Sequence, residues 1–330
     1  FNLISGNDED GVSITGTDTS FNRVAGNRIG TNRGGGLALP NASDGIAIGL
    51  FASDNIIGTD SSGDAFDAGE GNLISGNTMS GIDHFSGSGT VIAGNRIGTN
   101  RRGTAVIPNL IGIRIESNVT GLQIGTNGDG VADSVEGNLI SGNTVVGIDM
   151  RGNDHQVAGN LMGTNAAGTA ALPTGLAISA SLGPLGGGGQ MTIGGPDERF
   201  RNLISGHTGV AIEVTADDVV VECNFLGTDI TGTLPIPNVT AVNVTSGLNT
   251  DVLRNRIMFN DIGIGAKDTT VSRDNHLEGN TFAGVHYSGA AVTDAHDNWW
   301  GDPSGPTHPL NPGGTGDEAL EVGGGTIDYN

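Results

Sequence analysis

Four charged residues in short, strand-like segments, three of them at matching places, could perform chemistry on an acidic sugar. They are Asp83, Arg114, Asp149 and Arg151. An arginine in such a cluster can bind a substrate carboxylate or, with a depressed pKa, act as a base, while the aspartates hold a bridging calcium ion. The alternative is a surface ion pair that relieves charge on a crowded face, because Ser13 and Ala211 stand at the corresponding positions of other segments.

Two acidic segments have side-chain oxygens at a spacing that suits calcium. One contains Asn127, Asp129, Asp133 and Glu136, and the other contains Asp60, Asp64, Asp67 and Glu70. The first set resembles the Asx-rich loops that bind calcium, although Glu136 comes too early to be the last ligand of a 12-residue loop. The sequence therefore predicts calcium as a cofactor here, with solvated Asx turns that join two strands as the alternative.

Three aromatic residues gather near the end of the chain, namely Tyr287, Trp299 and Trp300. Paired tryptophans can stack on a sugar ring, which would make these residues substrate-binding. The alternative is a cap, in which bulky side chains close the open apolar end of the fold.

The composition excludes several classes of partner. The 330 residues include 59 glycines, and 36 acidic residues against 14 basic ones give a net charge of −22. A generic nucleic-acid binder needs a basic footprint, and anionic membranes also attract cations, so we expect neither partner. No apolar run approaches the roughly 18 residues that span a bilayer. The single cysteine, Cys223, excludes a disulfide framework and a cysteine-based zinc site.

An internal repeat determines the fold class. The phrase NLISGN begins at Asn2, Asn72 and Asn138, NLISGH begins at Asn202, and each is followed by a GNRIGTN-like and an LPN-like phrase. Runs of four or five residues alternate apolar and polar, which is typical of strands with one buried face. We therefore describe 1–330 as one domain with four long repeats and a tail of irregular final coils and a C-terminal cap: 2–71, 72–137, 138–201, 202–265 and 266–330.

Strands this short, at this spacing, predict an all-β parallel solenoid of about 15 coils of roughly 22 residues, in which each strand pairs with its equivalent one coil on. At about 4.8 Å per coil the rod would be roughly 70 Å long. Asn7, Asn77 and Asn143 would share a corner, with Asn27 and Asn95 between them in a ladder of side-chain amides.

The same register assigns the faces of the strands. Two inward columns are expected: Val12, Ile82, Ile148 and Val210, then Ile14, His84, Met150 and Ile212. The outward columns are Ser13, Asp83, Asp149 and Ala211, then Thr15, Phe85, Arg151 and Glu213. Arg114 would lie one coil, about 5 Å, from Asp83 and two coils, about 10 Å, from Asp149. His84 is expected as a neutral imidazole bonded to a backbone carbonyl.

These phrases, with NWWGDPSGPTHPLNPGGTGD from Asn298, resemble the right-handed parallel β-helix repeat proteins of bacterial surfaces, relatives of the pectate-lyase-like superfamily. The resemblance covers nearly the whole chain. It implies right-handed coils, an extracellular or cell-surface bacterial location and, often, an acidic polysaccharide as partner. The superfamily includes lyases, hydrolases, epimerases, tailspikes and adhesive stalks, so the fold does not choose among these activities. The sequence has no paired Asp-Asp accompanied by the Gly-His-Gly and Arg-Ile-Lys of polygalacturonase-like hydrolases, and no Asp-Pro-His motif like that of mannuronan epimerases.

Three functions are compatible with these residues. The first, which we favour, is a non-catalytic extracellular or cell-surface rod with a structural, adhesive or filament-forming role. The second is a calcium-assisted polysaccharide lyase or epimerase acting on a uronate-containing glycan. The third is a carbohydrate-binding module. The expected partners are an acidic or neutral polysaccharide, or a second copy bound end to end, because Phe1 enters in the middle of a repeat phrase as in a secreted fragment of a longer chain.

Overall fold

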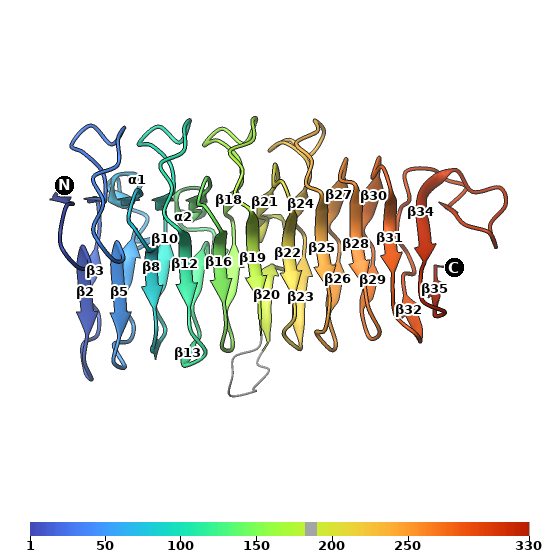
Figure 1. Cartoon of the computed structure of the whole chain (residues 1–330), viewed down its shortest axis with the longest axis horizontal. Helices are drawn as coiled ribbons and strands as arrows, with labels where there is room; N and C mark the ends of the chain where they lie inside the picture. The colour runs from blue at the N-terminus through green and yellow to red at the C-terminus, as the bar shows by residue number, and fades with distance from the viewer. Residues whose placement is uncertain (182–189, 330) are drawn as a thin grey trace.

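The computed structural model describes residues 1–181 and 190–329. Their regular structure is almost entirely strand, arranged in three long parallel sheets that wind as a right-handed parallel β-helix (Figure 1). The predicted fold class is therefore confirmed. No helix in the described ranges is long and apolar enough to cross a membrane.

Each coil contributes one strand to each sheet, in the order A, B, C. Sheet A contains β1 (Leu3–Ile4), β4 (Arg28–Ile29), β7 (Leu73–Ile74), β11 (Arg96–Ile97), β15 (Leu139–Ile140), β18 (Leu161–Met162), β21 (Leu203–Ile204), β24 (Phe225–Leu226), β27 (Arg256–Met258) and β30 (His276–Glu278). Sheet B contains β2 (Val12–Thr15), β5 (Ile46–Gly49), β8 (Ser80–His84), β12 (Ile111–Ile115), β16 (Val146–Met150), β19 (Leu176–Ala180), β22 (Val210–Val214), β25 (Thr240–Val244), β28 (Ile262–Ala266), β31 (Ala283–Tyr287), β34 (Gly316–Glu321) and β33 (Pro306–Thr307).

Sheet C closes the triangular coil. It contains β3 (Arg23–Val24), β6 (Ile56–Gly58), β10 (Val91–Ala93), β14 (Gln123–Gly125), β17 (Gln156–Ala158), β20 (Met191–Gly194), β23 (Val219–Glu222), β26 (Asp251–Leu253), β29 (Val271–Arg273), β32 (Val292–Asp294) and β35 (Thr326–Asp328). A separate pair, β9 (Gly87–Ser88) and β13 (Val119–Thr120), links two turns between sheets B and C.

The number of coils is lower than predicted. Within the described ranges, sheet B has eleven successive strands from β2 to β34, so the rod has about eleven coils rather than 15 and is roughly 50 Å long. NLISGN and GNRIGTN each begin a coil, whereas the LPN phrase closes a loop inside one. Coil lengths therefore alternate: Leu3 pairs with Arg28 after 25 residues, and Arg28 pairs with Leu73 after 45.

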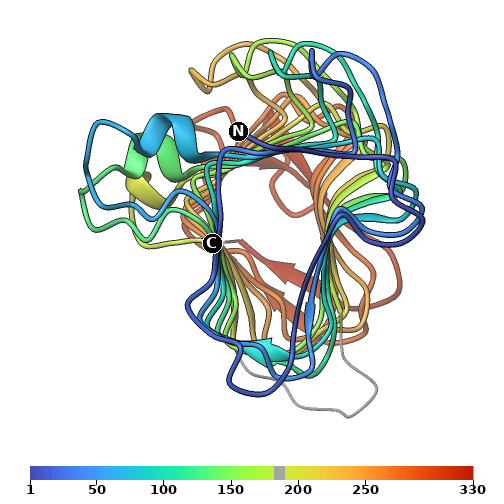
Figure 2. The same cartoon turned by 90° about the vertical axis from the view of Figure 1, so that its left-hand side faces the viewer.

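Two kinds of projection lengthen the long coils. Between sheets A and B, the loops 31–38, 99–106, 164–171 and 228–235 are each closed by an isolated antiparallel bridge. Between sheets C and A, insertions carry α1 (Asp67–Glu70), α2 (Asp133–Glu136) and the 3₁₀ helix η1 (Glu198–Phe200). Figure 2 shows these two rows of projections on either side of sheet A.

Stacked aliphatic side chains fill the interior, and two ladders of asparagine amides border sheet A. The first ladder contains Asn2, Asn27, Asn72, Asn95, Asn138, Asn160, Asn202, Asn224, Asn255, Asn275 and Asn298. The second contains Asn7, Asn41, Asn77, Asn109 and Asn143 and, beyond Thr174 and His207, Asn238, Asn260 and Asn280. The single predicted ladder is wrong, because Asn27 and Asn95 lie on the first corner and Asn7, Asn77 and Asn143 on the second.

Candidate functional site

The charged cluster predicted from the sequence lies on the outer face of sheet B. Arg114 on β12 pairs in register with Asp83 on β8 and with Asp149 on β16. Both aspartates are therefore one coil from Arg114, and the predicted separation of two coils from Asp149 is wrong. The error comes from the coil count, since β12 and β16 are consecutive strands of sheet B.

Glu116, which the sequence analysis missed, joins the two arginines of this cluster. Its carboxylate contacts Arg114 and lies 3.1 Å from Nη1 of Arg151, whose Nη2 lies 3.1 Å from Asp149. Both guanidinium groups thus already contact carboxylates, so neither can bind a substrate carboxylate without giving up an ion pair.

The strand pairing also corrects the predicted faces of the residues in the fourth long repeat. Ile212, not Val210, pairs with Ile178 in the inward column, so Glu213, not Ala211, occupies the outward column of Asp83 and Asp149. Glu213 accepts hydrogen bonds from Asn243 and from Thr245, each at 3.0 Å. The spacing within the phrase already indicates Ile212, because Ile82, Ile148 and Ile212 each lie ten residues after the first Asn of their phrase, so the predicted alignment was two residues out of step.

Asp83 has an unusual environment for a carboxyl group on an outer face. Burial raises its pKa to about 6, with a further rise from the charge of Asp44 that Arg114 partly offsets. Its Oδ1 is buried and has no hydrogen-bond partner in the described ranges. Burial also raises the pKa of Asp149, against the opposing effect of Arg151. A carboxyl group that titrates near neutral pH can exchange a proton with a ligand.

His84 lies beneath this cluster, in the interior as predicted, but its partner differs. Its Nε2 lies 3.0 Å from Oγ1 of Thr90 rather than from a backbone carbonyl, and its Nδ1 has no partner in the described ranges. Burial lowers the pKa of this imidazole to about 4. The neutral imidazole therefore belongs to the core.

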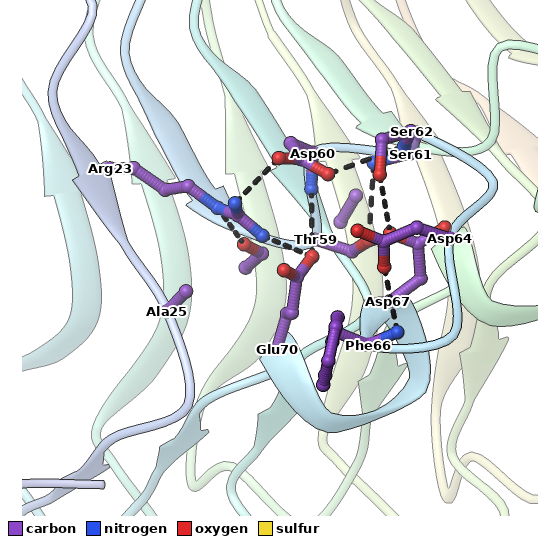
Figure 3. Close-up of polar contacts among 12 residues, drawn as sticks. Arg23, Ala25, Thr59, Asp60, Ser61, Ser62, Asp64, Phe66, Asp67 and Glu70 are labelled. Atoms are coloured by element: carbon purple, nitrogen blue, oxygen red, sulfur yellow. Dashed lines mark hydrogen bonds and ion pairs between the residues drawn. The ribbon is translucent and has the colours of Figure 1, made fainter.

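The first acidic insertion holds its carboxylates together around an arginine (Figure 3). Ligand atoms of Asp60, Asp67 and Glu70 lie within 4.8 Å of one another. Arg23, from the preceding coil, lies 2.5 Å from Asp60 and also contacts Glu70. Asp67 accepts hydrogen bonds from Ser62 and Gly63, and Asp64 accepts one from Phe66. The guanidinium group already supplies the positive charge that a calcium ion would bring.

The second insertion has the same frame without the arginine. Val91 stands on β10 where Arg23 stands on β3, each one coil before its insertion. Asp129 and Asp133 accept backbone hydrogen bonds from Val131 and Gly130. Glu136 is fully buried: Oε2 accepts from the backbone N–H of Asn127, while Oε1 has no partner in the described ranges. Oxygen-rich side chains suit calcium, so a calcium ion at 127–136 stays a prediction.

The aromatic residues near the carboxyl end differ in exposure. Tyr287 is fully buried and donates its hydroxyl hydrogen bond to Asp268, and Trp300 is 3% exposed in the core. Trp299 is 42% exposed and extends the outer face of sheet A, next to His276. Of these three side chains, Trp299 alone offers a ring to a ligand.

A second cluster, which the sequence analysis missed, lies on the outer face of sheet A. Arg28 and Arg96 occupy one outward column, with Leu73 between them. The loops 31–38 and 99–106 overhang this column and stack through a hydrogen bond from the Arg101 N–H to the Gly35 carbonyl, 2.8 Å long. The sequence does contain a signal for this cluster, because the arginine of the phrase is present in only two of its four copies. The copies are GNRIGTN at 26 and 94, GNLMGTN at 159 and CNFLGTD at 223.

Three adjoining cavities make this face a trough. The largest, about 650 Å³, lies between Gly34–Gly36, Arg96 and Asn100–Arg102. A second of about 370 Å³ extends to Arg28 and the α1 insertion, and a third of about 330 Å³ extends to the α2 insertion. Arg96 lines all three. We call this hollow the sheet A trough, lined by Arg28, Leu73, Arg96, Arg101, Arg102, Leu139 and Leu161.

In comparisons with known proteins, no family model, no curated protein and no solved structure matches the chain. The β-helix fold is therefore established by its own strand pairing, and the activity has to be argued from the two clusters.

Proposed function

We propose that this chain is a non-catalytic extracellular rod that holds an extended glycan against its side. The observation that supports this proposal is the sheet A trough, whose three adjoining cavities follow the rod axis from the first coil to the loop 164–171. A linear hollow along successive coils suits a linear polymer better than a compact small molecule. The resemblance to pectate-lyase-like surface proteins supports the extracellular location.

Apolar side chains in the same outward column supply surface on which sugar rings can pack. Beyond Arg96 the column continues with Leu139, Leu161, Leu203, Phe225, Arg256 and His276, and it ends at Trp299. Leu139 and Leu203 are buried beneath the loops 99–106 and 164–171, so the accessible apolar surface comes from Leu161, Phe225 and the exposed Trp299. Aromatic and aliphatic side chains bind the C–H faces of sugars, while polar groups at the edge fix orientation.

The test is binding against polymer length together with product analysis. Affinity for linear glycans should rise with chain length until the polymer spans the roughly 50 Å rod, and the bound glycan should be recovered unchanged in size. Affinity that is independent of length would contradict lengthwise binding. New reducing ends, or rising near-ultraviolet absorbance from an unsaturated uronate, would contradict the non-catalytic role.

One observation favours a second function, a polysaccharide lyase or epimerase acting at sheet B. Asp83 has a pKa of about 6 and lies next to Arg114, so a base and a cation stand one coil apart. The same absorbance assay on alginate and pectate, with and without calcium, tests this alternative. A rise that Asp83→Asn abolishes would assign the activity to sheet B.

A further inference from the structure

The arginines of this acidic protein fall into two groups. Seven lie within 4 Å of a carboxylate: Arg23, Arg114, Arg151, Arg199, Arg201, Arg254 and Arg273. The other six have no such partner in the described ranges, and they are Arg28, Arg33, Arg96, Arg101, Arg102 and Arg256. All six belong to the outward column of sheet A or to the first two loops above it. In a chain with 36 acidic residues, the uncompensated guanidinium groups are thus gathered on one face.

Five of the six lie on the first two long repeats. Arg28 and Arg96 are two coils apart in the outward column, which places their Cα atoms about 10 Å from each other. Arg33, Arg101 and Arg102 come from the overhanging loops. The cavities of about 650 and 370 Å³ share Arg96 and Arg101, and their walls include no acidic residue. Positive charge therefore faces this hollow from its floor and from its overhang.

The fold does not require these cations. In the third long repeat Leu161 occupies the position of Arg96, and Ala166 occupies that of Arg101. The loop stacking survives, because the N–H of Ala166 donates to Gly103 as that of Arg101 donates to Gly35. Arginines that the frame can replace by Leu and Ala are available for a ligand.

We propose that the sheet A trough binds the carboxylate or sulfate groups of a linear acidic polysaccharide through Arg28, Arg96, Arg101 and Arg102. This inference rests on the proposed function and adds the chemical class of the partner and the residues that recognise it. A guanidinium group pairs with carboxylate or sulfate through two parallel hydrogen bonds.

Charge density favours a glycan over a nucleic acid. The net charge of −22 repels any polyanion outside this patch. A duplex carries one negative charge for about every 1.7 Å of its axis, whereas Arg28 and Arg96, which have no carboxylate partner in the described ranges, are about 10 Å apart and are followed by leucines. An acidic glycan, with fewer charges and apolar ring faces, fits both the arginines and the accessible apolar side chains of the column, Leu161, Phe225 and Trp299.

The decisive variant combines Arg96→Leu with Arg101→Ala, which installs the residues that the third repeat uses at the same positions. Binding of heparin, of alginate and of neutral dextran to the full chain is measured by titration calorimetry in chelator at two salt concentrations. We expect the double variant to lose roughly 100-fold in affinity for the anionic glycan, about tenfold for each charged pair, and to show a shallower salt dependence. Arg199→Ala, which removes an exposed arginine paired with Asp197, is the matched control and should change affinity less than about twofold.

A gain-of-function variant gives a second test, because misfolding cannot produce a gain in affinity. Leu161→Arg with Ala166→Arg extends the positive column into the third repeat and should raise affinity for the same glycan at least about tenfold, with an unchanged circular dichroism spectrum. Heparin binding alone identifies sulfate as the recognised group, and alginate binding alone identifies carboxylate; either supports the inference. Equal affinity for dextran, or full binding by the double variant, overturns it and leaves the proposed rod intact. If no glycan of any kind binds, the proposed function fails as well, and tight binding of DNA would overturn the choice of a glycan.

Discussion

Replacing Asp83 by asparagine should stabilise the protein near neutral pH. The carboxyl group lies half-buried on the outer face of sheet B, and burial is the largest cause of its raised pKa, followed by the charge of Asp44. Arg114 attracts the carboxylate of Asp83, but the ion pair that Arg114 forms is with Glu116. Ionised Asp83 therefore destabilises the folded state, and a neutral amide of nearly the same shape removes this destabilisation.

The magnitude follows from the shift of the pKa from 3.8 to about 6. At about 1.4 kcal/mol per pKa unit the ionised form is disfavoured in the folded state by at most about 3 kcal/mol, and partial hydration of the carboxylate reduces this to about 1–2 kcal/mol. Because the folded pKa is raised, the fold is favoured while Asp83 is protonated, and this advantage is lost as the pH rises from 3.8 through 6. The gain from Asp83→Asn should thus be constant above about pH 7 and vanish below about pH 4.

Urea denaturation of both proteins at about pH 8 and about pH 4 measures this effect as a difference in the free energy of unfolding. Glu116→Gln is the matched control on the same face, since it removes the carboxylate that joins Arg114 and Arg151, and it should lower stability at about pH 8. A loss of stability in Asp83→Asn at that pH, or an equal effect at both pH values, would refute the reasoning. It would show that Asp83 serves as an ordinary ion-pair partner of Arg114.

Three further predictions concern the core, the acid response and calcium. Ile140→Asp places an unpaired charge at a fully buried position and should lower the free energy of unfolding by several kcal/mol; an unchanged melting curve would refute the register. Burial lowers the pKa of His207 to about 4, so stability that is complete above about pH 6.5 should fall by up to about 3 kcal/mol as the pH approaches 4. His207→Asn, which installs the residue found at most positions of this ladder, should remove the pH-dependent loss of stability. Parallel curves of unfolding free energy against pH for the variant and the original protein would contradict the prediction. Asp129→Ala with Asp133→Ala should lower the melting temperature in calcium and leave it unchanged in chelator, whereas equal loss in both would dismiss calcium.

The sequence was sufficient for the fold because the stacking makes each coil copy its neighbours. Repeated NLISGN phrases with period-2 alternation predict parallel, in-register strands, and the structure has them in three sheets. The coil count was wrong because each long repeat forms two coils of unequal length rather than three of 22 residues: Leu73 pairs with Arg96 after 23 residues, and Arg96 pairs with Leu139 after 43. The period of a solenoid sequence reports the repeat, but a loop that leaves a coil and returns to it, as 31–38 does, cannot be recognised from the spacing until the strand pairing is known.

The two clusters differ in how readily the sequence indicates them. Asp83, Arg114 and Asp149 stand out because they interrupt a column of small residues. The adjacency of Asp83 and Arg114 followed from a register that was correct over β8 and β12, whereas Asp149 was placed one coil too far from Arg114. Arg28 and Arg96 stand at the same place in a repeated phrase, GNRIGTN, so neither stands out in the sequence. Their significance depends on which carboxylates lie within reach, and that is a property of three-dimensional packing rather than of spacing.

The placement of charge on the two faces follows one rule. Like charges on successive coils, about 5 Å apart, repel by about 3 kcal/mol at an effective dielectric constant of about 20, and by about half that at 10 Å. Sheet B meets this constraint by alternating sign, as in Asp83, Arg114 and Asp149. Sheet A meets it by spacing, since Leu73 separates Arg28 from Arg96. On the alternating face both arginines have carboxylate partners, whereas Arg28 and Arg96 on the spaced face have none in the described ranges, so it is on sheet A that an anionic partner gains most by binding.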